Sequence, residues 1–239
     1  MNWHDVEPQS EEWHALRLGK LGSSEFSKVI TPKKLKLSSQ AAGLMNRILA
    51  ERITGMPVEN FATEWMERGI EMEDQAVRAY EAITDAETTR GGLFLEDAGV
   101  LCCSPDRLVG DVGDLEIKCP LIQTQVGYAL NGLDEEYKLQ LQGRMMLHGR
   151  AWVDIFSYHP LFSIPPLRVN RDDKLIAIMR PVIEQFRDSM LEAHLKLERN
   201  FGPFTKPEAP PPDHTADLPT HAEVDELVRL GGIVPGGAR

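Results

Sequence analysis

The sequence predicts an α/β (α+β) fold in which a mixed central β-sheet is flanked by helices. A length of 239 residues is enough for one such domain with a well-buried core. Hydrophobic residues make up 42% of the chain and charged residues 26%, which is the usual balance of a globular protein. Helix-like periodicity and strand-like alternation both occur, and no internal repeat is evident. These three observations favour a single mixed domain.

Helices are predicted where apolar residues recur about every 3.6 positions. In chain order, the predicted helices cover residues 10–17, 23–30, 39–54, 61–83, 134–148 and 172–199. Ser10 caps the first helix, whose first turn is acidic, and Gly55 follows the third. The loop between the second and third helices carries Lys33, Lys34 and Lys36. We expect these lysines to contact phosphate; a solvated charged loop is the alternative.

Strands are predicted mainly in the middle of the chain, where short apolar runs are bounded by turn residues. In chain order, they cover roughly residues 86–96, 99–104, 114–118, 151–158 and 167–170. The runs at 100–103 and 114–118 are expected to pair as a hairpin. Their connection contains the turn Gly110-Asp-Val-Gly-Asp114.

The composition changes abruptly near residue 203, so we predict one folded domain over residues 1–202 and a tail over residues 203–239. Six prolines mark the start of this tail: Pro203, Pro207, Pro210, Pro211, Pro212 and Pro219. Such a segment is typical of an extended or disordered linker. A short amphipathic helix is predicted at residues 221–230.

Several classes of protein are disfavoured by composition. No apolar run approaches the ~18 residues that span a bilayer, and the N-terminus lacks the pattern of a secretory signal. The three cysteines, Cys102, Cys103 and Cys119, form neither a disulfide framework nor a CxxC pair. A reducing cytoplasm therefore fits best. The net charge of −11 predicts that any DNA contact is confined to a groove in an otherwise acidic surface.

Asp106, Glu116 and Lys118 form the motif that carries the most chemistry. Side chains two positions apart on a strand share a face, so Glu116 and Lys118 point the same way and Ile117 points into the core. Asp106 leaves the partner strand and can approach the same spot. Two carboxylates would bind Mg²⁺ or Mn²⁺ rather than Zn²⁺. Lys118 would orient or activate the attacking water, or stabilise the phosphorane charge.

This pattern, a Pro-Asp followed by Glu-x-Lys, is that of a metal-dependent nuclease. The alternative is a solvated hairpin with surface charges. No histidine pair and no Walker loop point to another chemistry.

Other polar residues are candidates for the same site. Either Glu71 or Glu73 can point inward from the 61–83 helix, but not both, because positions i and i+2 do not share a helix face. A glutamine of the 134–148 helix, Gln140 or Gln142, could hold the attacking water or a phosphate; helical period alone does not decide between them. For the acidic pair, the alternative is an ordinary solvated helix face.

Arg17 and Ser24 could form a terminal-phosphate pocket. They lie beside glycines and a helix N-terminus, where a guanidinium, a hydroxyl and free N–H groups favour an anion. The alternative is a surface arginine and an N-cap serine.

Six motifs in order, over residues 12 to 200, resemble the phage lambda exonuclease family (YqaJ-like viral recombinases) of the restriction-endonuclease-like PD-(D/E)xK superfamily. They are Trp13-His-Ala-Leu-Arg-Leu-Gly19, Ser24-Glu25, Gly69-x-x-x-Glu73, Cys103-Ser-Pro-Asp106, Leu115-Glu-Ile-Lys-Cys-Pro120 and Tyr137-x-x-Gln140. The resemblance implies a restriction-endonuclease-like core.

The resemblance also implies a role for each matching position. The Mg²⁺ ligands would be Asp106, Glu116 and the main-chain carbonyl of Ile117, and Lys118 would be the catalytic lysine. Glu73 matches the helix carboxylate of the family, which binds metal directly or through water, and Gln140 matches its active-site glutamine. Arg17 matches the arginine that holds the 5′-phosphate, and Ser24 matches a neighbouring active-site serine.

The function implied is a Mg²⁺-dependent 5′→3′ exonuclease, with Mn²⁺ as a possible substitute. It would degrade one strand of linear duplex DNA to mononucleotides and leave 3′ overhangs for recombination by strand annealing. The implied partners are DNA ends, two further copies in a homotrimer ring and a single-strand annealing protein, in the cytoplasm of a bacterial host. An endonuclease and a non-catalytic DNA-end-binding protein are the alternatives. Two features depart from the family pattern: Arg107, where glycine is common, and the proline-rich tail.

Overall fold

The computed structural model describes residues 1–58, 64–132 and 135–204, without the side chains of residues 64–71 and 135–136. The described residues belong to one unit, Met1–Phe204. The predicted tail helix at 221–230, the linker from residue 205 onward and the Glu71 side chain lie outside the described residues.

The helices follow the predicted pattern, with one addition. They are α1 (Glu11–Arg17), the 3₁₀ turn η1 (Ser23–Glu25), α2 (Phe26–Val29), α3 (Ala41–Thr54), α4 (Glu64–Thr84), α5 (Ile122–Asn131), α6 (Glu135–His148) and α7 (Asp173–Phe201). The Ser10 hydroxyl accepts a hydrogen bond from the Trp13 N–H at 3.2 Å, as an N-cap does. Gly55 ends α3 in the left-handed conformation, with φ of 69°. The addition is α5, which follows the Glu-Ile-Lys strand.

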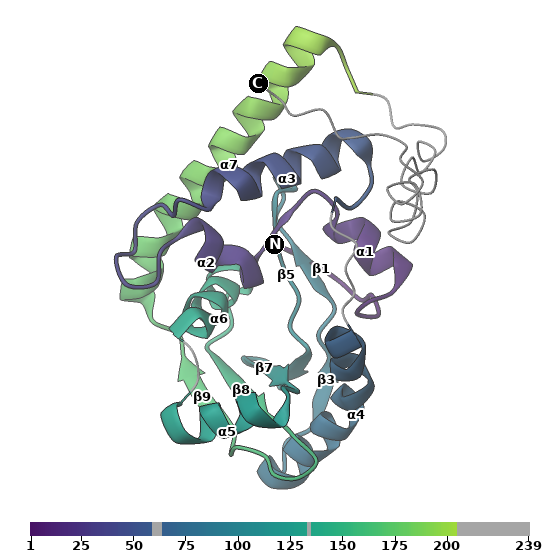
Figure 1. Ribbon diagram of the computed structural model, residues 1–239, viewed down its shortest axis with the longest axis vertical. Helices are drawn as coiled ribbons and strands as arrows, with labels where there is room; N and C mark the ends of the chain where they lie inside the picture. The colour runs from purple at the N-terminus through teal and green to yellow at the C-terminus, as the bar shows by residue number, and fades with distance from the viewer. Residues whose placement is uncertain (59–63, 133–134, 205–239) are drawn as a thin grey trace, which may run out of the picture. The chain divides into compact units, whose positions relative to one another are not determined.

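The strands form two sheets, and both are mixed (Figure 1). The first has the order β1-β4-β5-β2, with β1 (Asn2–His4), β4 (Leu93–Leu95), β5 (Leu101–Cys103) and β2 (Leu21–Gly22). The second has the order β3-β6-β7-β8-β9, with β3 (Thr88–Arg90), β6 (Arg107–Val109), β7 (Gly113–Lys118), β8 (Trp152–Ser157) and β9 (Leu167–Asn170). Among the strands of the described residues, only β2–β5 and β7–β8 pair in parallel. The predicted mixed α/β fold with flanking helices is confirmed, although its strands divide into two sheets.

The division occurs where two chain segments cross. Gly91 and Gly92 separate β3 from β4, and the segment 104–106 separates β5 from β6. A Cβ atom on Gly91 would lie 1.7 Å from the Pro105 carbonyl oxygen, so the two crossings touch. Asp106 is therefore held at the junction of the two sheets.

The predicted hairpin is partly wrong. The strand that pairs with β7 through the glycine-bearing turn is β6, in the register Arg107 to Leu115 and Val109 to Gly113. The run at 100–103 instead forms β5 in the other sheet. Asp106 thus lies immediately before the partner strand rather than after it.

Four apolar clusters lie within the described residues, and two of them position the layers around β7. Residues of α2, α3 and α7 form the larger one, and Figure 1 shows α3 and α7 lying together on one side of the unit. In the second cluster, α4 packs Ala76, Val77 and Tyr80 against Leu115 and Ile117 of β7. Every second residue of β7 is thus fixed in the core, which turns the alternate residues to the opposite face.

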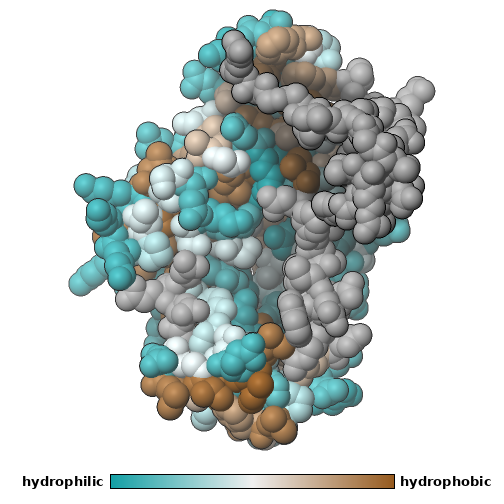
Figure 2. Space-filling view, viewed as in Figure 1, coloured by the Kyte–Doolittle hydropathy of each residue, from teal (hydrophilic) through white to brown (hydrophobic). Residues whose placement is uncertain are grey.

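One apolar face remains exposed on α5. Ile122, Val126 and Leu130 follow each other at four-residue spacing, and all are at least 36% exposed. In Figure 2 the apolar colouring gathers at the lower end of this view, where Figure 1 places α5.

Gly91→Ala is expected to lower the free energy of unfolding by about 2–3 kcal/mol, because the methyl group would push apart two backbone segments. Urea unfolding of the purified protein measures this change. Gly43→Ala is the matched control, since a Cβ there, in the first turn of α3, meets nothing within 4 Å. Equal stability of the two variants would contradict the crossing at Pro105.

Candidate active site

The face of β7 that turns away from α4 carries three charged residues. Asp114, Glu116 and Lys118 alternate with the core residues Leu115 and Ile117. Asp114 is fully buried and Glu116 is 4% exposed, whereas the side chain of Lys118 is 26% exposed. The strand therefore presents a buried carboxylate pair that ends in a lysine at the accessible edge.

Asp106 is tied directly to this strand. Its Oδ2 accepts a hydrogen bond from the Ile117 N–H at 2.6 Å. Asp106 therefore lies close to Glu116 and Lys118, as the sequence led us to expect. The β6–β7 turn and the crossing at Gly91 fix it from both sides.

Glu116 is the centre of the site. Its Oε1 accepts hydrogen bonds from Lys118 Nζ at 2.5 Å and from Gln140 Nε2 at 2.8 Å. Its Oε2 accepts one from Arg144 Nη1 at 2.5 Å. Lys118 Nζ also lies 5.0 Å from the ring centroid of Tyr137, a cation–π distance. One carboxylate thus holds a lysine, a glutamine and an arginine.

The structure resolves which glutamine faces the site. Gln140 contacts Glu116, whereas Gln142 bonds the Asn170 carbonyl and the Asp172 N–H, both at 2.8 Å. Gln142 therefore ties α6 to the start of α7. Helical period alone did not decide between these two residues. The side of α6 that faces β7 carries Gln140, and the side that faces the start of α7 carries Gln142.

Arg144, Asp114 and His148 were not singled out by sequence reasoning. Arg144 Nη2 lies 2.7 Å from Asp114 Oδ1, and His148 Nε2 lies 2.6 Å from Asp114 Oδ2. A signal was available. Gln140, Arg144 and His148 are four residues apart on α6 and so share a face, just as Asp114 and Glu116 share a face of β7.

The charges of this cluster shift the protonation of its members. Burial raises the pKa of Asp106 well above its usual value, and the nearby Glu116 charge raises it further. Burial also acts upward on the pKa of Glu116, but Lys118 and Arg144 outweigh it and lower that pKa to about 2. Burial lowers the pKa of Lys118, yet the carboxylates of Glu116 and Asp106 turn the net shift upward. Glu116 is therefore an anion and Lys118 a cation at neutral pH.

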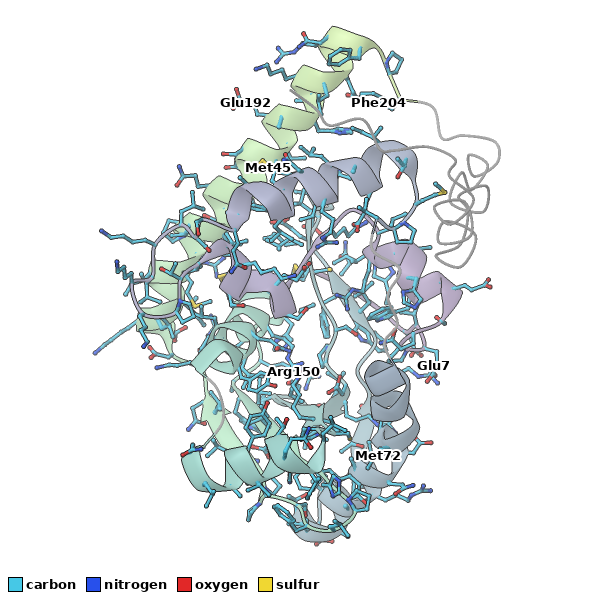
Figure 3. The ribbon with its side chains drawn as sticks, in the orientation of Figure 1. Glu7, Met45, Met72, Arg150, Glu192 and Phe204 are labelled. Carbon is cyan, nitrogen blue, oxygen red and sulfur yellow. The ribbon has the colours of Figure 1, made fainter. Side chains whose placement is uncertain are left out.

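Glu73 joins the site from α4. Together with Asp106, Arg107 and Glu7, it lines a cavity of about 110 Å³. Figure 3 shows Glu7 beside the upper end of α4 in this view, with Met72 further along the same helix. Burial raises the pKa of Glu73, and Arg107 partly opposes this shift. Arg107, the departure from the family pattern, thus places positive charge beside Glu73.

Arg17 and Ser24 lie together around Gly22. A Cβ on Gly22 would lie 2.9 Å from Arg17 Nη2 and 3.4 Å from Ser24 Oγ. Arg17 also stacks over the ring of Trp13, with Cζ 4.3 Å from its centroid. Trp13 Nε1 in turn donates to Ser104 Oγ at 3.0 Å, two residues before Asp106. The proposed phosphate pocket is therefore linked to the carboxylate site through the segment that carries Asp106.

Lys33 and Lys34 are not brought into this cluster. Both are exposed in the loop between α2 and α3, as is Lys36. In the described residues, no ion pair or hydrogen bond is recorded for their side chains. Their role as phosphate contacts stays a prediction.

The family model for the YqaJ-like viral recombinase domain matches residues 12–151, more than half of the chain. The chain belongs to this family. No curated protein gives a significant match.

Solved structures agree with the YqaJ-like assignment. An alkaline exonuclease (LHK-Exo) from Laribacter hongkongensis is 33% identical, with a TM-score of 0.72 over 80% of this chain and 97% of that one. The complex of LHK-Exo with dAMP is similar at 32% identity, with the same TM-score and coverage. A phage-related exonuclease from Haemophilus somnus 129PT shares the fold at 15% identity, with a TM-score of 0.57 over 74% of this chain and 96% of that one.

The residues of this YqaJ-like site fit a divalent cation. Glu116 supplies buried oxygen atoms and Asp106 partly buried ones, and their mutual repulsion is a cost that a cation between them would offset. Across the described residues, no group of three or more His, Cys, Asp or Glu side chains is gathered for metal binding, so the fit rests on this pair. The expected ligation by the Ile117 carbonyl stays a prediction. In the same residues, no helix has the length and apolarity needed to cross a membrane.

Proposed function

We propose that the protein is a Mg²⁺-dependent 5′→3′ exonuclease that digests one strand of linear duplex DNA to mononucleotides. The observation that carries the proposal is the convergence of Asp106, Glu116 and Lys118 at one end of β7, with Gln140 on the same carboxylate. The family and the exonuclease structures support it. The 3′ overhangs would feed recombination by a single-strand annealing protein, and Mn²⁺ could replace Mg²⁺.

Each residue has a task that follows from its position. Asp106 and Glu116 would hold the cation, which when bound supplies Lewis-acid stabilisation of the reacting phosphodiester. Lys118, at the accessible edge of the site, would donate to the phosphate oxygens as negative charge develops there. The Gln140 amide, held by Glu116, would orient the attacking water or a phosphate oxygen.

The preference for DNA ends would come from Arg17 and Ser24. A guanidinium binds a terminal phosphate in a bidentate manner, and a hydroxyl adds a third donor. Gly22 leaves room for both side chains because it has no Cβ. The pocket would anchor the 5′-phosphate while the next phosphodiester enters the carboxylate site.

The central experiment compares three substrates in Mg²⁺: linear duplexes with 5′-phosphate ends, linear duplexes with 5′-hydroxyl ends, and closed circles. We expect fast release of mononucleotides from the phosphorylated ends, slower release from the hydroxyl ends, and intact circles. EDTA should stop all digestion. Cutting of the closed circles would instead identify an endonuclease, and binding of ends without any digestion would identify a non-catalytic protein.

Arg17→Ala is expected to reduce the preference for 5′-phosphate over 5′-hydroxyl ends by about 10- to 100-fold, because it removes a charge-assisted bidentate contact. Gly22→Ala should weaken the preference in the same direction at nearly unchanged stability. Its methyl group displaces only the flexible end of Arg17, and its backbone φ of −78° suits alanine. The measurement is the ratio of kcat/KM on the two substrates.

The control for these variants is Arg199→Ala, an exposed arginine on α7. It removes the same charge at a position outside the site and should leave the ratio unchanged. An unchanged ratio in both Arg17→Ala and Gly22→Ala would remove Arg17 from end recognition.

Processive digestion would be explained by a homotrimer ring around the DNA. Light scattering of the purified protein tests this assembly. A monomeric mass at the working concentration would contradict it.

A further inference from the structure

Arg144 is a deeply buried charged residue beside the carboxylate site. Its side chain is 1% exposed, although a buried guanidinium loses most of its hydration. Two carboxylates offset this loss: Glu116 Oε2 at 2.5 Å and Asp114 Oδ1 at 2.7 Å. The arginine therefore bridges two residues that share one face of β7.

Asp114 is itself held from the other side. The Arg150 N–H donates to His148 Nδ1 at 3.0 Å, so the proton of a neutral His148 lies on Nε2. That Nε2 lies 2.6 Å from Asp114 Oδ2. The chain of contacts runs from the Arg150 backbone through His148, Asp114 and Arg144 to Glu116. Asp114 Oδ2 and both Glu116 oxygens lie at hydrogen-bonding distance from a partner, whereas Asp114 Oδ1 is paired with Arg144 by charge alone.

The chain of contacts separates the two oxygens of Glu116. Oε2 faces the buried arginine, and Oε1 faces Lys118 and Gln140, where the protein surface is reached. A carboxylate that is free to rotate could offer both oxygens to one cation. With Oε2 held by Arg144, only Oε1 is available on the accessible side.

We propose that Arg144 is a positioning residue that occupies Oε2 of Glu116 and so limits this carboxylate to a single oxygen for the divalent cation. Asp114 and His148 keep the arginine in place. The proposal rests on the metal-dependent function proposed above and adds to it a trade-off. A fixed positive charge lowers the affinity of the site for cations, and in return Glu116 has one orientation for catalysis.

Two substitutions separate this role from simple structural support. Arg144→Gln removes the positive charge, so the dissociation constant for Mn²⁺ should fall by roughly tenfold or more. Asp114→Asn removes the opposing negative charge, so the dissociation constant should rise by roughly tenfold. Both variants lose partners in a buried network, and both should have a lower Tm. Support of the fold alone would not move the two affinities in opposite directions.

The experiment is a calorimetric titration of the full-length protein with Mn²⁺ in the absence of DNA, with Tm measured in parallel. A decrease in the dissociation constant for Arg144→Gln together with an increase for Asp114→Asn supports the proposal. Shifts in the same direction, or no shift in either variant, overturn it. Turnover at saturating Mn²⁺ should nevertheless fall by about 100-fold in Arg144→Gln, because Glu116 loses its fixed orientation.

The double variant Arg144→Gln/Asp114→Asn covers the case in which a single variant does not fold. It leaves the total charge unchanged, so its dissociation constant for Mn²⁺ should return close to that of the wild type while turnover stays low. Wild-type turnover would overturn the proposal. Digestion of DNA by the wild-type protein tests the proposed function separately. A protein that binds Mn²⁺ but digests nothing would refute the nuclease proposal, while the affinities of the variants still decide the role of Arg144.

Discussion

Lys118→Ala is expected to slow digestion of 5′-phosphorylated linear duplex DNA by about 100- to 1,000-fold at saturating Mg²⁺. Lys118 Nζ lies at the accessible end of the carboxylate cluster, 2.5 Å from Glu116 Oε1 and over the ring of Tyr137. The ammonium group can therefore reach a phosphate while Glu116 fixes its position. The substitution removes the ammonium charge of Lys118, and Glu116 keeps its hydrogen bonds with Arg144 and Gln140. Single-turnover rates on preformed complexes measure the chemical step directly.

Lys138→Ala provides the control, since Lys138 is an exposed lysine on α6. Its rate should equal that of the wild type. Binding of DNA ends by Lys118→Ala should also stay within a few-fold of wild type, because Arg17 and Ser24 are untouched. If Lys118→Ala kept more than a tenth of the wild-type rate, the residue would not be catalytic.

Local features of the carboxylate site could be predicted from the sequence. Strand alternation placed Glu116 and Lys118 on one face and Ile117 in the core, because the period of a strand depends only on backbone geometry. The cap at Ser10 and the end of α3 at Gly55 followed from residue chemistry in the same way. The convergence of Asp106 on Glu116 was also expected, although the strand assumed to deliver it was wrong.

The division into two sheets could not be predicted because it depends on contacts between distant segments. The contact of Gly91 with Pro105 separates β3 from β4 and β5 from β6 at once. Taken alone, neither Gly91 nor Pro105 indicates which strands pair with each other. Helix α5 escaped prediction for a local reason: Leu121 at its N-cap makes no side-chain capping bond, so the usual start signal is absent.

The buried charges were also beyond local reasoning. An arginine in a helix is usually solvated, and only the packing of α6 on β7 brings Arg144 to Asp114 and Glu116, which precede it by about 30 residues. The same packing selects Gln140 over Gln142. Sequence spacing identified the faces of each element, but not which faces meet.

Asp106→Asn is expected to abolish digestion, with a loss of at least about 1,000-fold, and to make the metal-free protein more stable. Asparagine keeps an oxygen that can accept the Ile117 N–H, so the junction at β7 is preserved. It removes a partly buried negative charge that Glu116 and Glu73 both repel. A gain of roughly 1 kcal/mol would raise the Tm by about 2–4 °C in a chain of this size.

Thermal unfolding in EDTA and again in excess Mn²⁺ tests both parts of this expectation. In EDTA, Asp106→Asn should unfold at a higher temperature than the wild type. In Mn²⁺ the order should reverse, because only the wild type gains the stabilisation that a bound ion gives. Asp111→Asn, in the exposed turn before β7, removes the same charge and should change neither Tm nor activity. A lower Tm of Asp106→Asn in EDTA would contradict this expectation. It would show that the Asp106 carboxylate stabilises the sheet junction more than its repulsion by Glu116 and Glu73 destabilises the metal-free protein.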